Sequence, residues 1–338
     1  MMLDIPLDIP LTARHLRFHI RALTPIVLGR YTGSALRGAL ATALRATFCP
    51  ASAETKENPL HLQLCPVCRL LALENDGSID GDIRRPYALE PDVTLPSQLD
   101  AGDRWHFDLA IYGEDRMLFQ FLLLTVGGMG DFGLGRKGDD GRRGRFVVET
   151  IENIQPITNA CETILASHEH LVQEPTLLVE HPAVMATADA LHQQLVARDN
   201  QLQIQFLTPT RIMQKQHTIH KPDFFPLAKA LTQRILDLAA QFGEGRPTWA
   251  GAPFSLKEQL YPYADAVQLV GNQTRWWDIK GYSSRIDRKQ VLGGLVGEAT
   301  YVAPDWRPLL PWLVWGMSTH VGKNAVKGCG LYRLRVEP

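Results

Sequence analysis

The sequence predicts an α+β protein built from two tandem ferredoxin-like domains, each with the element order β-α-β-β-α-β. Two observations lead to this prediction. The chain has 338 residues, more than a typical single core, and alternating apolar segments and helical apolar stripes recur in the same order in both halves. We expect a first domain at 12–152, a linker with an added strand and helix at 153–200, and a second domain at 201–338.

The composition is typical of a globular protein and excludes some classes. Hydrophobic residues make up 45% and charged residues 21%, and no run of 18 apolar residues suggests a membrane span. The formal net charge of −1 means that any nucleic-acid binding must depend on local basic patches. Five cysteines and an N-terminus without a basic leader predict a cytoplasmic protein without a signal peptide.

The first half shows the periodicities of one such domain. Leu16, Phe18 and Ile20 alternate with polar residues, which predicts a half-buried strand over 14–22. Ser34 is expected to cap the next helix, because apolar residues recur at helical spacing after it. The remaining elements are, in order, that helix to Phe48, a strand near 85–95, a strand at 105–111, a helix at about 116–126, a glycine-rich loop at 127–135 and a strand at 145–151.

The same order restarts after residue 200. Leu202, Ile204 and Phe206 alternate as in a strand, and Asp223 is expected to cap a helix that ends at Gly243. The remaining elements are strands at 274–282 and 291–302, a helix from a cap at Asp305 to about Thr319, a second glycine-rich loop and a strand at 331–336. Each copy is therefore predicted to end in a helix, a glycine-rich loop and a strand.

One glycine pattern fits a dinucleotide-binding fingerprint only by its letters. Gly128, Gly130 and Gly133 have the required spacing, but the predicted context is a helix followed by a strand. The fingerprint requires a strand followed by a helix. We therefore reject a nicotinamide-binding interpretation.

An insertion at about 49–100 in the first domain contains a cysteine cluster. Cys49, His61, Cys65 and Cys68 have the spacing Cys-x11-His-x3-Cys-x2-Cys, which could supply four ligands to a structural zinc ion. The alternative is that these residues are ordinary buried thiols and a histidine.

The C-terminal glycine-rich loop combines glycines with basic residues and has no acidic residue from 306 to 336. Glycines let a backbone approach a ligand closely and expose its N–H groups, and neighbouring lysines favour an anion such as phosphate. The residues concerned are Gly322, Gly328 and Gly330, together with His320, Lys323 and Lys327.

As a set, these residues resemble the CRISPR-associated RAMP endoribonucleases of the Cas-six family, which cut precursor CRISPR RNA at its repeats. The family hallmark is His-Val-Gly-Lys, a spacer and Gly-x-Gly before the last strand, matched here by 320–323 and 328–330. Similar stretches occur at 206–211 with 222–224, and at 281–285 leading into 293–297. The resemblance implies two RRM-like RAMP domains, CRISPR repeat RNA as partner, and other CRISPR effector subunits as further partners.

Cleavage of RNA without a metal cofactor uses the 2′-hydroxyl as nucleophile, a base, an acid and a cation beside the phosphate. His320 is the best candidate acid or base in the loop, with a helix C-cap as its alternative role, and Lys323 is the best electrostatic group. The resemblance also implies a histidine and a tyrosine near the first helix. Tyr31 matches the tyrosine, but no histidine lies between Ile20 and His61.

Basic clusters are candidate RNA-binding surfaces, because phosphates are contacted by Arg and Lys; the alternative is a solvated surface. The clusters are Arg136, Lys137, Arg142, Arg143 and Arg145; Arg285, Arg288 and Lys289; and Lys327, Arg333 and Arg335 beside the last loop. Trp276, Trp277 and Tyr282 could stack on bases or pack in the core.

Two other functions remain open. A non-catalytic RAMP subunit would hold CRISPR RNA within an effector complex through the same residues. A metabolic enzyme with two ferredoxin-like domains should show a compact cluster of acids and histidines, which the sequence does not suggest.

Overall fold

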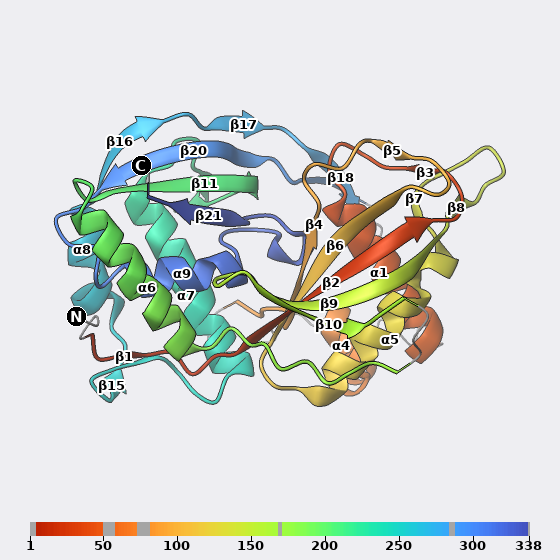
Figure 1. Ribbon diagram of the computed structural model, residues 1–338, viewed down its shortest axis with the longest axis horizontal. Coiled ribbons are helices and arrows are strands. Elements are labelled where there is room, and N and C mark those ends of the chain that lie inside the picture. The colour runs from red at the N-terminus through yellow and green to blue at the C-terminus, as the bar shows by residue number, and fades with distance from the viewer. Residues whose placement is uncertain (1–4, 50–57, 73–81, 168–170, 284–287, 337–338) are drawn as a thin grey trace.

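Two antiparallel sheets lie side by side in the computed structural model, each with helices packed on one face (Figure 1). The structure describes residues 5–49, 58–72, 82–167, 171–283 and 288–336. The prediction of an α+β chain with two ferredoxin-like units is confirmed by the strand order of both sheets. No helix in these described ranges has the length and apolar character needed to cross a bilayer.

The first sheet has the strand order β10-β9-β2-β6-β4, in which every neighbouring pair is antiparallel. In the ferredoxin-like pattern the fourth strand pairs the first, the first pairs the third and the third pairs the second, and β9, β2, β6 and β4 follow it. β4 is the strand expected near 85–95, and β10 is the added edge strand. The strands are β2 (Ala13–Ala22), β4 (Tyr87–Pro91), β6 (Arg104–Tyr112), β9 (Phe146–Gln155) and β10 (Ala160–Leu165).

Helices α1 (Gly33–Phe48) and α5 (Arg116–Phe132) pack against each other and against this sheet. Leu16, Phe18 and Ile20 are buried beneath them, as their alternation predicted. The expected cap of the first helix was wrong by two residues. Thr32 occupies the N-cap position without a side-chain cap hydrogen bond, so Ser34 lies inside the first turn.

The predicted loop at 127–135 is helical as far as Phe132, which corrects the sequence analysis. A Cβ atom on Gly130 would lie 1.8 Å from the carbonyl oxygen of Phe146. This glycine therefore lets α5 approach β9 closely, and the helix is held by packing rather than by propensity. The turn before the last strand is instead a hairpin of β7 (Leu134–Lys137) and β8 (Arg143–Gly144).

The second sheet repeats the arrangement with the order β16-β20-β11-β21, and β17 also pairs with β20. The predicted strand at 274–282 is two strands, β17 and β18, and β16 precedes them. The strands are β11 (Gln201–Thr210), β16 (Gln268–Asn272), β17 (Arg275–Trp277), β18 (Lys280–Ser283), β20 (Gly294–Val302) and β21 (Tyr332–Arg335).

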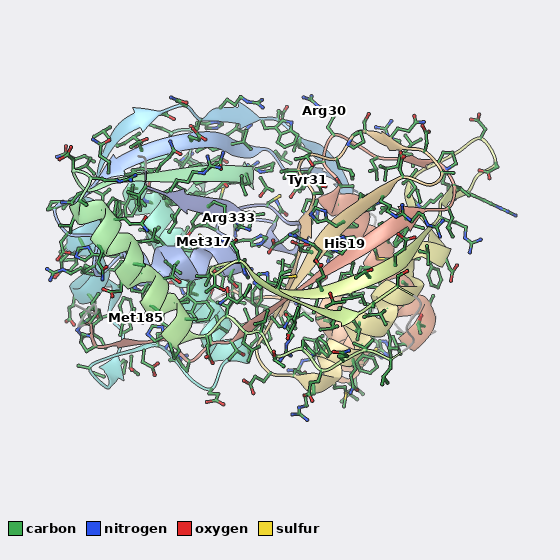
Figure 2. All side chains as sticks on the ribbon, in the orientation of Figure 1. His19, Arg30, Tyr31, Met185, Met317 and Arg333 are labelled. Carbon is green, nitrogen blue, oxygen red and sulfur yellow. The ribbon has the colours of Figure 1, made fainter. Side chains whose placement is uncertain are left out.

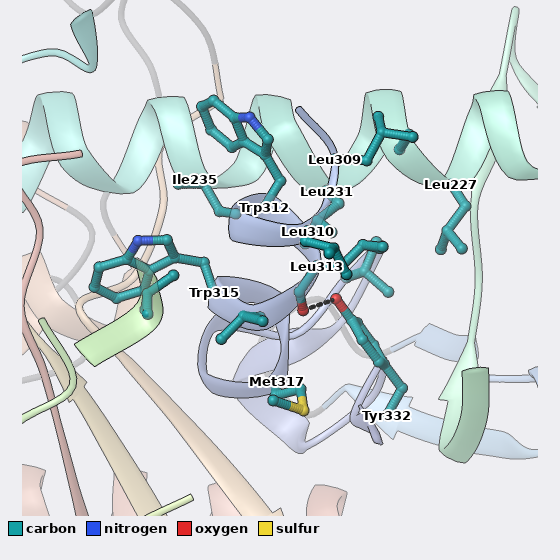
Figure 3. Close-up of a cluster of buried hydrophobic side chains, with 14 of the residues drawn as sticks. Leu227, Leu231, Ile235, Leu309, Leu310, Trp312, Leu313, Trp315, Met317 and Tyr332 are labelled. Carbon is teal, nitrogen blue, oxygen red and sulfur yellow. Dashed lines mark hydrogen bonds between the residues drawn. The ribbon is translucent and has the colours of Figure 1, made fainter. Parts of the chain in front are cut away.

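Helices α7 (Phe224–Phe242) and α9 (Leu310–Thr319) form the core of this half with β21 (Figure 3). Tyr332 of β21 donates a hydrogen bond to the carbonyl of Leu313 at 2.7 Å, which anchors the last strand to α9. Asp223 occupies the N-cap position of α7 as predicted, although its side chain makes no cap hydrogen bond. The cap expected at Asp305 was wrong, because Asp305 accepts hydrogen bonds from Arg307 in a turn before α9 begins.

The N-terminal segment and one further helix complete this core. Leu7, Ile9 and Leu11 pack into it, and β1 (Leu7–Asp8) pairs with β14 (Thr248–Trp249). Helix α6 (His181–Val196) packs on α9 and is the helix expected in the segment between the two halves.

The other described elements are short. The strands are the antiparallel pair β3 (Ile26–Val27) and β5 (Gln98–Leu99), the hairpin of β12 (Met213–Gln214) and β13 (His217–Thr218), β15 (Ala252–Pro253) and β19 (Arg288–Val291). The helices are α3 (Pro59–Leu64), α4 (Pro66–Ala72) and α8 (Tyr261–Asp265), with a π turn η1 (Leu256–Leu260) and a 3-10 turn η2 (Ala325–Lys327).

Candidate active site

The C-terminal glycine-rich loop lies where the two halves of the molecule meet. It begins at His320, directly after α9, and ends at β21. A Cβ atom on Gly33 of α1 would lie 1.8 Å from the carbonyl oxygen of Lys327, and one on Gly328 would lie 2.3 Å from that of Leu89 in β4. The loop of the second half is therefore packed tightly against the first.

The three loop glycines all have positive φ angles, of 83°, 78° and 81°. Gly322 faces the carbonyl of Arg211, Gly328 faces Leu89 and Gly330 faces Val321, each closer than a Cβ atom allows. Glycine is therefore required at these positions by the conformation and packing of the loop itself. Their role in approaching a phosphate stays a prediction.

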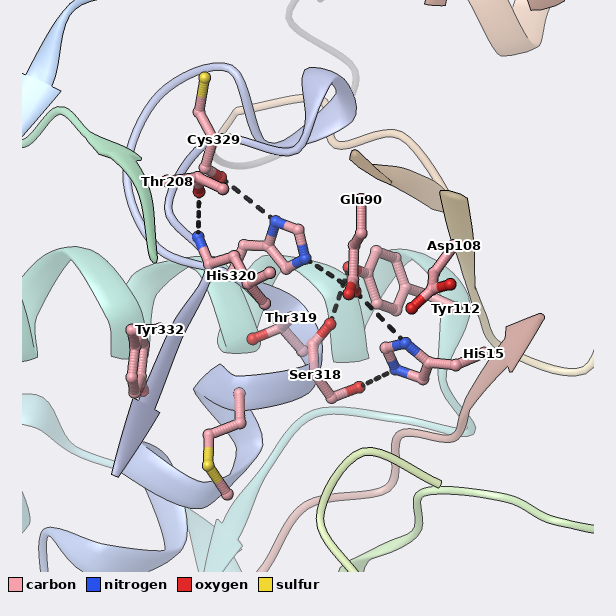
Figure 4. A network of polar contacts seen from close by, with 12 residues as sticks. His15, Glu90, Asp108, Tyr112, Thr208, Ser318, Thr319, His320, Cys329 and Tyr332 are labelled. Carbon is pink, nitrogen blue, oxygen red and sulfur yellow. Dashed lines mark hydrogen bonds and ion pairs between the residues drawn. The ribbon is translucent and has the colours of Figure 1, made fainter. Parts of the chain in front are cut away.

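His320 points inward from the end of α9 and is completely buried (Figure 4). Its Nε2 lies 3.0 Å from Oε1 of Glu90 on β4, and its Nδ1 lies 3.2 Å from the carbonyl oxygen of Cys329. The same carboxylate oxygen lies 3.3 Å from Nδ1 of His15 on β2, whose Nε2 contacts the hydroxyl of Ser318 at 2.7 Å. One carboxylate thus joins a histidine from each half.

The protonation of this network follows from its partners. Burial alone would raise the pKa of Glu90, but contacts with His15 and His320 outweigh burial and lower that pKa below its ordinary value. A carbonyl can only accept, so Nδ1 of His320 carries a proton towards Cys329. Nε2 of the same ring faces Glu90, so His320 links the loop to β4 through its two ring nitrogens.

Neither His15 nor Glu90 was identified from the sequence. His15 begins the alternation of β2, and Glu90 stands in the strand that had been placed only by the fold pattern. The register of the sheet pairs Glu90 with Asp108, which in turn holds Arg17 through two hydrogen bonds of 2.8 and 2.9 Å. This pairing of distant strands is what a single-sequence pattern does not contain.

Tyr31 lies just before α1 and contacts the glycine-rich loop. Its hydroxyl donates to the carbonyl of Lys327 at 2.8 Å, and its ring packs edge-on against Trp277 of β17 with centroids 6.0 Å apart. Burial raises the pKa of the Tyr31 hydroxyl well above its usual value, so the phenol stays protonated at neutral pH. The structure thus brings Tyr31 and the loop together, although they are nearly 300 residues apart.

Lys327 lies under the loop and is only 8% exposed. Burial, and then the nearby guanidinium of Arg37 on α1, lower the pKa of its ammonium group to about 8. With this pKa, the Lys327 amine can exchange a proton near neutral pH. Arg37 was not among the residues identified from the sequence.

Lys323 is the exposed member of the loop. Its side chain is 56% exposed, and its Nζ lies 3.6 Å from the carboxylate of Asp82. No acid lies near His320, Lys323 or Arg335 in the sequence before Glu337, but in the structure each of them has one. His320 has Glu90, Lys323 has Asp82, and Arg335 lies 3.9 Å from Glu298.

The first basic cluster occupies the β7–β8 hairpin, directly before β9. Arg136, Lys137 and Arg142 are exposed there. Arg143 instead donates to the carbonyl of Gly135, and Arg145 pairs with Asp131 at 2.5 Å. Figure 1 places this hairpin at the end of the molecule away from the second half, on the same upper edge as β3, β5 and β18.

The second cluster is only partly visible. Arg285 lies outside the described residues, and Arg288 and Lys289 are described only as backbone of β19, paired with β18. The aromatic residues before this hairpin are half-buried: Trp277 packs against Tyr31, and Trp276 lies 4.2 Å from the ring of His220. Figure 2 shows Arg30 at the upper edge of the molecule and Tyr31 below it.

The predicted metal ligands converge in the insertion. The ligand atoms of Cys49, His61, Cys65 and Cys68 all lie within 4.8 Å of one another. Cys49 Sγ is 3.4 Å from Nε2 of His61 and 3.6 Å from Sγ of Cys68. Zinc–ligand bonds of about 2.0–2.3 Å in a tetrahedron place ligand atoms about 3.5–3.8 Å apart, so this group could hold a metal ion.

Comparisons with known proteins bear on both halves. Residues 204–332 match the family model of the CRISPR-associated endoribonuclease Cas6, and residues 11–177 match a family model described as an N-terminal domain. A search of curated proteins finds no match.

Solved structures are similar over most of the chain. A product complex of a Thermus thermophilus Cas6 is 15% identical with a TM-score of 0.52, and the match covers 95% of this chain and 98% of that one. A chain of a partial Cas6-RT-Cas1–Cas2 complex is 13% identical with a TM-score of 0.57, and the match covers 96% of this chain and 46% of that one. At sequence identities of 13–15%, these structural matches show that the chain shares the fold of those proteins.

Proposed function

Because residues 204–332 match the family model of the CRISPR-associated endoribonuclease Cas6, we propose that the chain is an endoribonuclease that cuts CRISPR repeat RNA at the junction between its two halves. One observation carries this proposal. The glycine-rich loop of the second half meets Tyr31, at the start of the first helix, with a hydrogen bond of 2.8 Å to Lys327. The site therefore exists only when both halves are packed together.

We propose that cleavage needs no metal ion. The 2′-oxygen attacks the adjacent phosphorus, the bond from phosphorus to the 5′-oxygen breaks, and the products are a 2′,3′-cyclic phosphate and a 5′-hydroxyl. The proton of the 2′-hydroxyl must pass to a base, and the leaving oxygen must receive a proton. In this proposal Lys327, with a pKa of about 8, is the base, and the protonated Tyr31 is the donor.

The remaining loop residues have supporting roles in this proposal. Lys323, exposed and held only by a surface ion pair, neutralises the charge that grows on the phosphate. His320, whose direct catalytic role was predicted from the sequence, is buried against Glu90; we propose that it positions the loop instead.

The test is a single-turnover cleavage assay with CRISPR repeat RNAs in EDTA, followed by mapping of the product ends. We expect cyclic phosphate ends, and a rate that rises with pH as the Lys327 ammonium loses its proton near pH 8. Tyr31→Phe and Lys323→Ala should each slow cutting by about a hundredfold with little loss of affinity. Lys327→Arg, which cannot deprotonate, should remove the pH dependence.

Binding without cleavage would instead support the non-catalytic subunit. Its sign would be tight repeat-RNA binding by the parent protein with no cut product in EDTA or in magnesium. Cleavage at the parent rate by both Tyr31→Phe and Lys327→Arg would place the catalytic groups elsewhere.

We also propose that Cys49, His61, Cys65 and Cys68 hold one structural zinc ion that fixes α3 and α4 to the end of α1. Elemental analysis should find about one zinc per chain. Cys68→Ala should lose the zinc and lower the thermal midpoint, whereas Cys161→Ala, which changes an exposed cysteine of β10, should do neither. A fully folded protein without zinc would refute this proposal.

A further inference from the structure

A second concave surface lies on the helical side of the molecule, away from the glycine-rich loop. It is a cleft of about 830 Å³ between the two halves, bounded by α1, α4 and α5 on one side and the end of α7 on the other. At its base Gly113 touches Phe242, so closely that a Cβ atom would lie 2.2 Å from the Phe242 carbonyl oxygen. We call this surface the arginine cleft.

Apolar side chains form most of the arginine cleft, and two of them are unusually exposed. Leu64 of α3 is 73% exposed and Met117 of α5 is 63% exposed, although both line the cleft. Large apolar side chains gathered in a concavity mark a surface that another molecule covers.

The charge of the arginine cleft is one-sided. Arg69, Arg84, Arg85 and Arg246 line it, whereas its only carboxylate among the described residues is Asp115. The carboxylate of Asp115 caps α5, because it accepts a hydrogen bond from the backbone N–H of Leu118. Arg84 is held by Asp237 at 2.7 Å, but Arg69 and Arg246 are exposed at the rim.

The residue types indicate which kind of molecule fits. Protein–protein interfaces are enriched in Arg, Met and aromatic residues and depleted in Lys and Glu. Among the described residues that line the cleft there is neither Lys nor Glu. Surfaces for single-stranded RNA combine a basic groove with exposed aromatic rings for stacking, but Phe121 and Phe242 are half-buried here and Tyr112 is 1% exposed.

We propose that the arginine cleft docks a segment of a partner protein that carries apolar side chains flanked by carboxylates. The apolar side chains fill the space between Leu64 and Met117, and the carboxylates pair with Arg69 and Arg246. Leu44, which lines the cleft, is 11 residues along α1 from Gly33 at the glycine-rich loop, or about 16 Å. The cleft and the glycine-rich loop therefore lie at different positions along α1.

The test uses a fluorescein-labelled amphipathic helical peptide of about 15 residues, with Leu at i, i+4 and i+7 and Glu on the flanks. Two matched peptides replace Glu by Lys, or Leu by Ser. We expect the Leu/Glu peptide to bind most tightly by fluorescence anisotropy. Met117→Ser and Arg246→Glu should each weaken its binding by about tenfold or more.

Matched variants separate docking from general effects. Leu124→Ser changes another exposed residue of α5, and Lys229→Glu changes an exposed charge on α7. Neither residue lines the cleft. Both should bind the peptide like the parent, and Arg69→Gln with Arg246→Gln provides a milder double variant if charge reversal impairs folding by circular dichroism.

Three results would overturn the proposal: equal binding of all three peptides, unchanged binding by Met117→Ser and by the arginine variants, or displacement of the peptide by oligouridine of about 15 nucleotides. The last result, with RNA affinity lost in Arg246→Glu, would assign the cleft to RNA.

Discussion

Replacing Glu90 by Gln should loosen the junction that holds the glycine-rich loop. The carboxylate is buried and contacts a histidine from each half, at 3.0 Å for His320 and 3.3 Å for His15. Gln keeps the shape but removes the charge, so the two histidines lose the buried carboxylate that contacts both of them. Removing one partner of a buried pair costs about 3–5 kcal/mol.

The assay is urea unfolding monitored by tryptophan fluorescence, which reports on the buried Trp306, Trp312 and Trp315 of the second core. With a dependence of about 2 kcal/mol per molar urea, the loss lowers the midpoint by about 2 M. Glu152→Gln is the matched control, since Glu152 also contacts a histidine, His19, at 2.8 Å. Its side chain is 25% exposed and that of His19 is 40% exposed, so the cost should be about 0–1 kcal/mol.

The pH dependence gives an independent check of the same network. The pKa of Glu90 is lower in the folded protein than its ordinary value of 4.5, so its ionised form stabilises the fold above that value. This stability is lost as the pH falls below 4.5 towards the folded pKa. The difference between parent and Glu90→Gln should therefore be full at pH 7 and shrink in acid. Equal midpoints for Glu90→Gln and Glu152→Gln at pH 7 would refute this account of the junction.

Three further predictions concern two glycines, each with a matched control, and one arginine. Gly130→Ala should destabilise the protein by about 1–3 kcal/mol in urea unfolding, because the new Cβ meets the Phe146 carbonyl. Gly127→Ala in the same helix has open space around it and should stabilise the protein by up to about 1 kcal/mol. The reverse order of stability would contradict the packing of α5 on β9. Gly328→Ala should abolish repeat-RNA cleavage by forcing the loop away from Leu89. Gly141→Ala, with a similar φ angle but no neighbour within 4 Å, should cut like the parent. Equal cleavage rates for the two variants would show that the packing of the loop does not matter for catalysis. Arg142→Ala should weaken RNA binding and reduce the salt slope by about one, and an unchanged slope would remove the β7–β8 hairpin from the interface.

Much of the fold followed from periodicity, because alternation and helical stripes record which face of an element is buried. β4 was placed only because a ferredoxin-like order needs a strand there, and the structure contains it at Tyr87–Pro91. The segment 127–132 was misassigned because its glycines are poor helix formers. Its close contact with β9, between Gly130 and Phe146 at 16 positions' separation, keeps it helical.

The candidate site was only partly predictable for a similar reason. The cysteine and histidine spacing indicated a cluster, and the structure brings those four ligand atoms together. For His320, counting charges nearby in the sequence suggested an unopposed basic loop. Its true neighbour, Glu90, is 230 residues away and reaches it only through the packing of one half on the other.

The most direct test of the central claim replaces the 2′-hydroxyl at the cleavage position of the repeat RNA with hydrogen. Because the proposed nucleophile is this hydroxyl, the protein should bind the 2′-deoxy RNA with parent affinity and fail to cut it, in EDTA or in magnesium. Cleavage of the 2′-deoxy RNA at the same position would show that an external nucleophile performs the reaction, and would contradict the proposed mechanism.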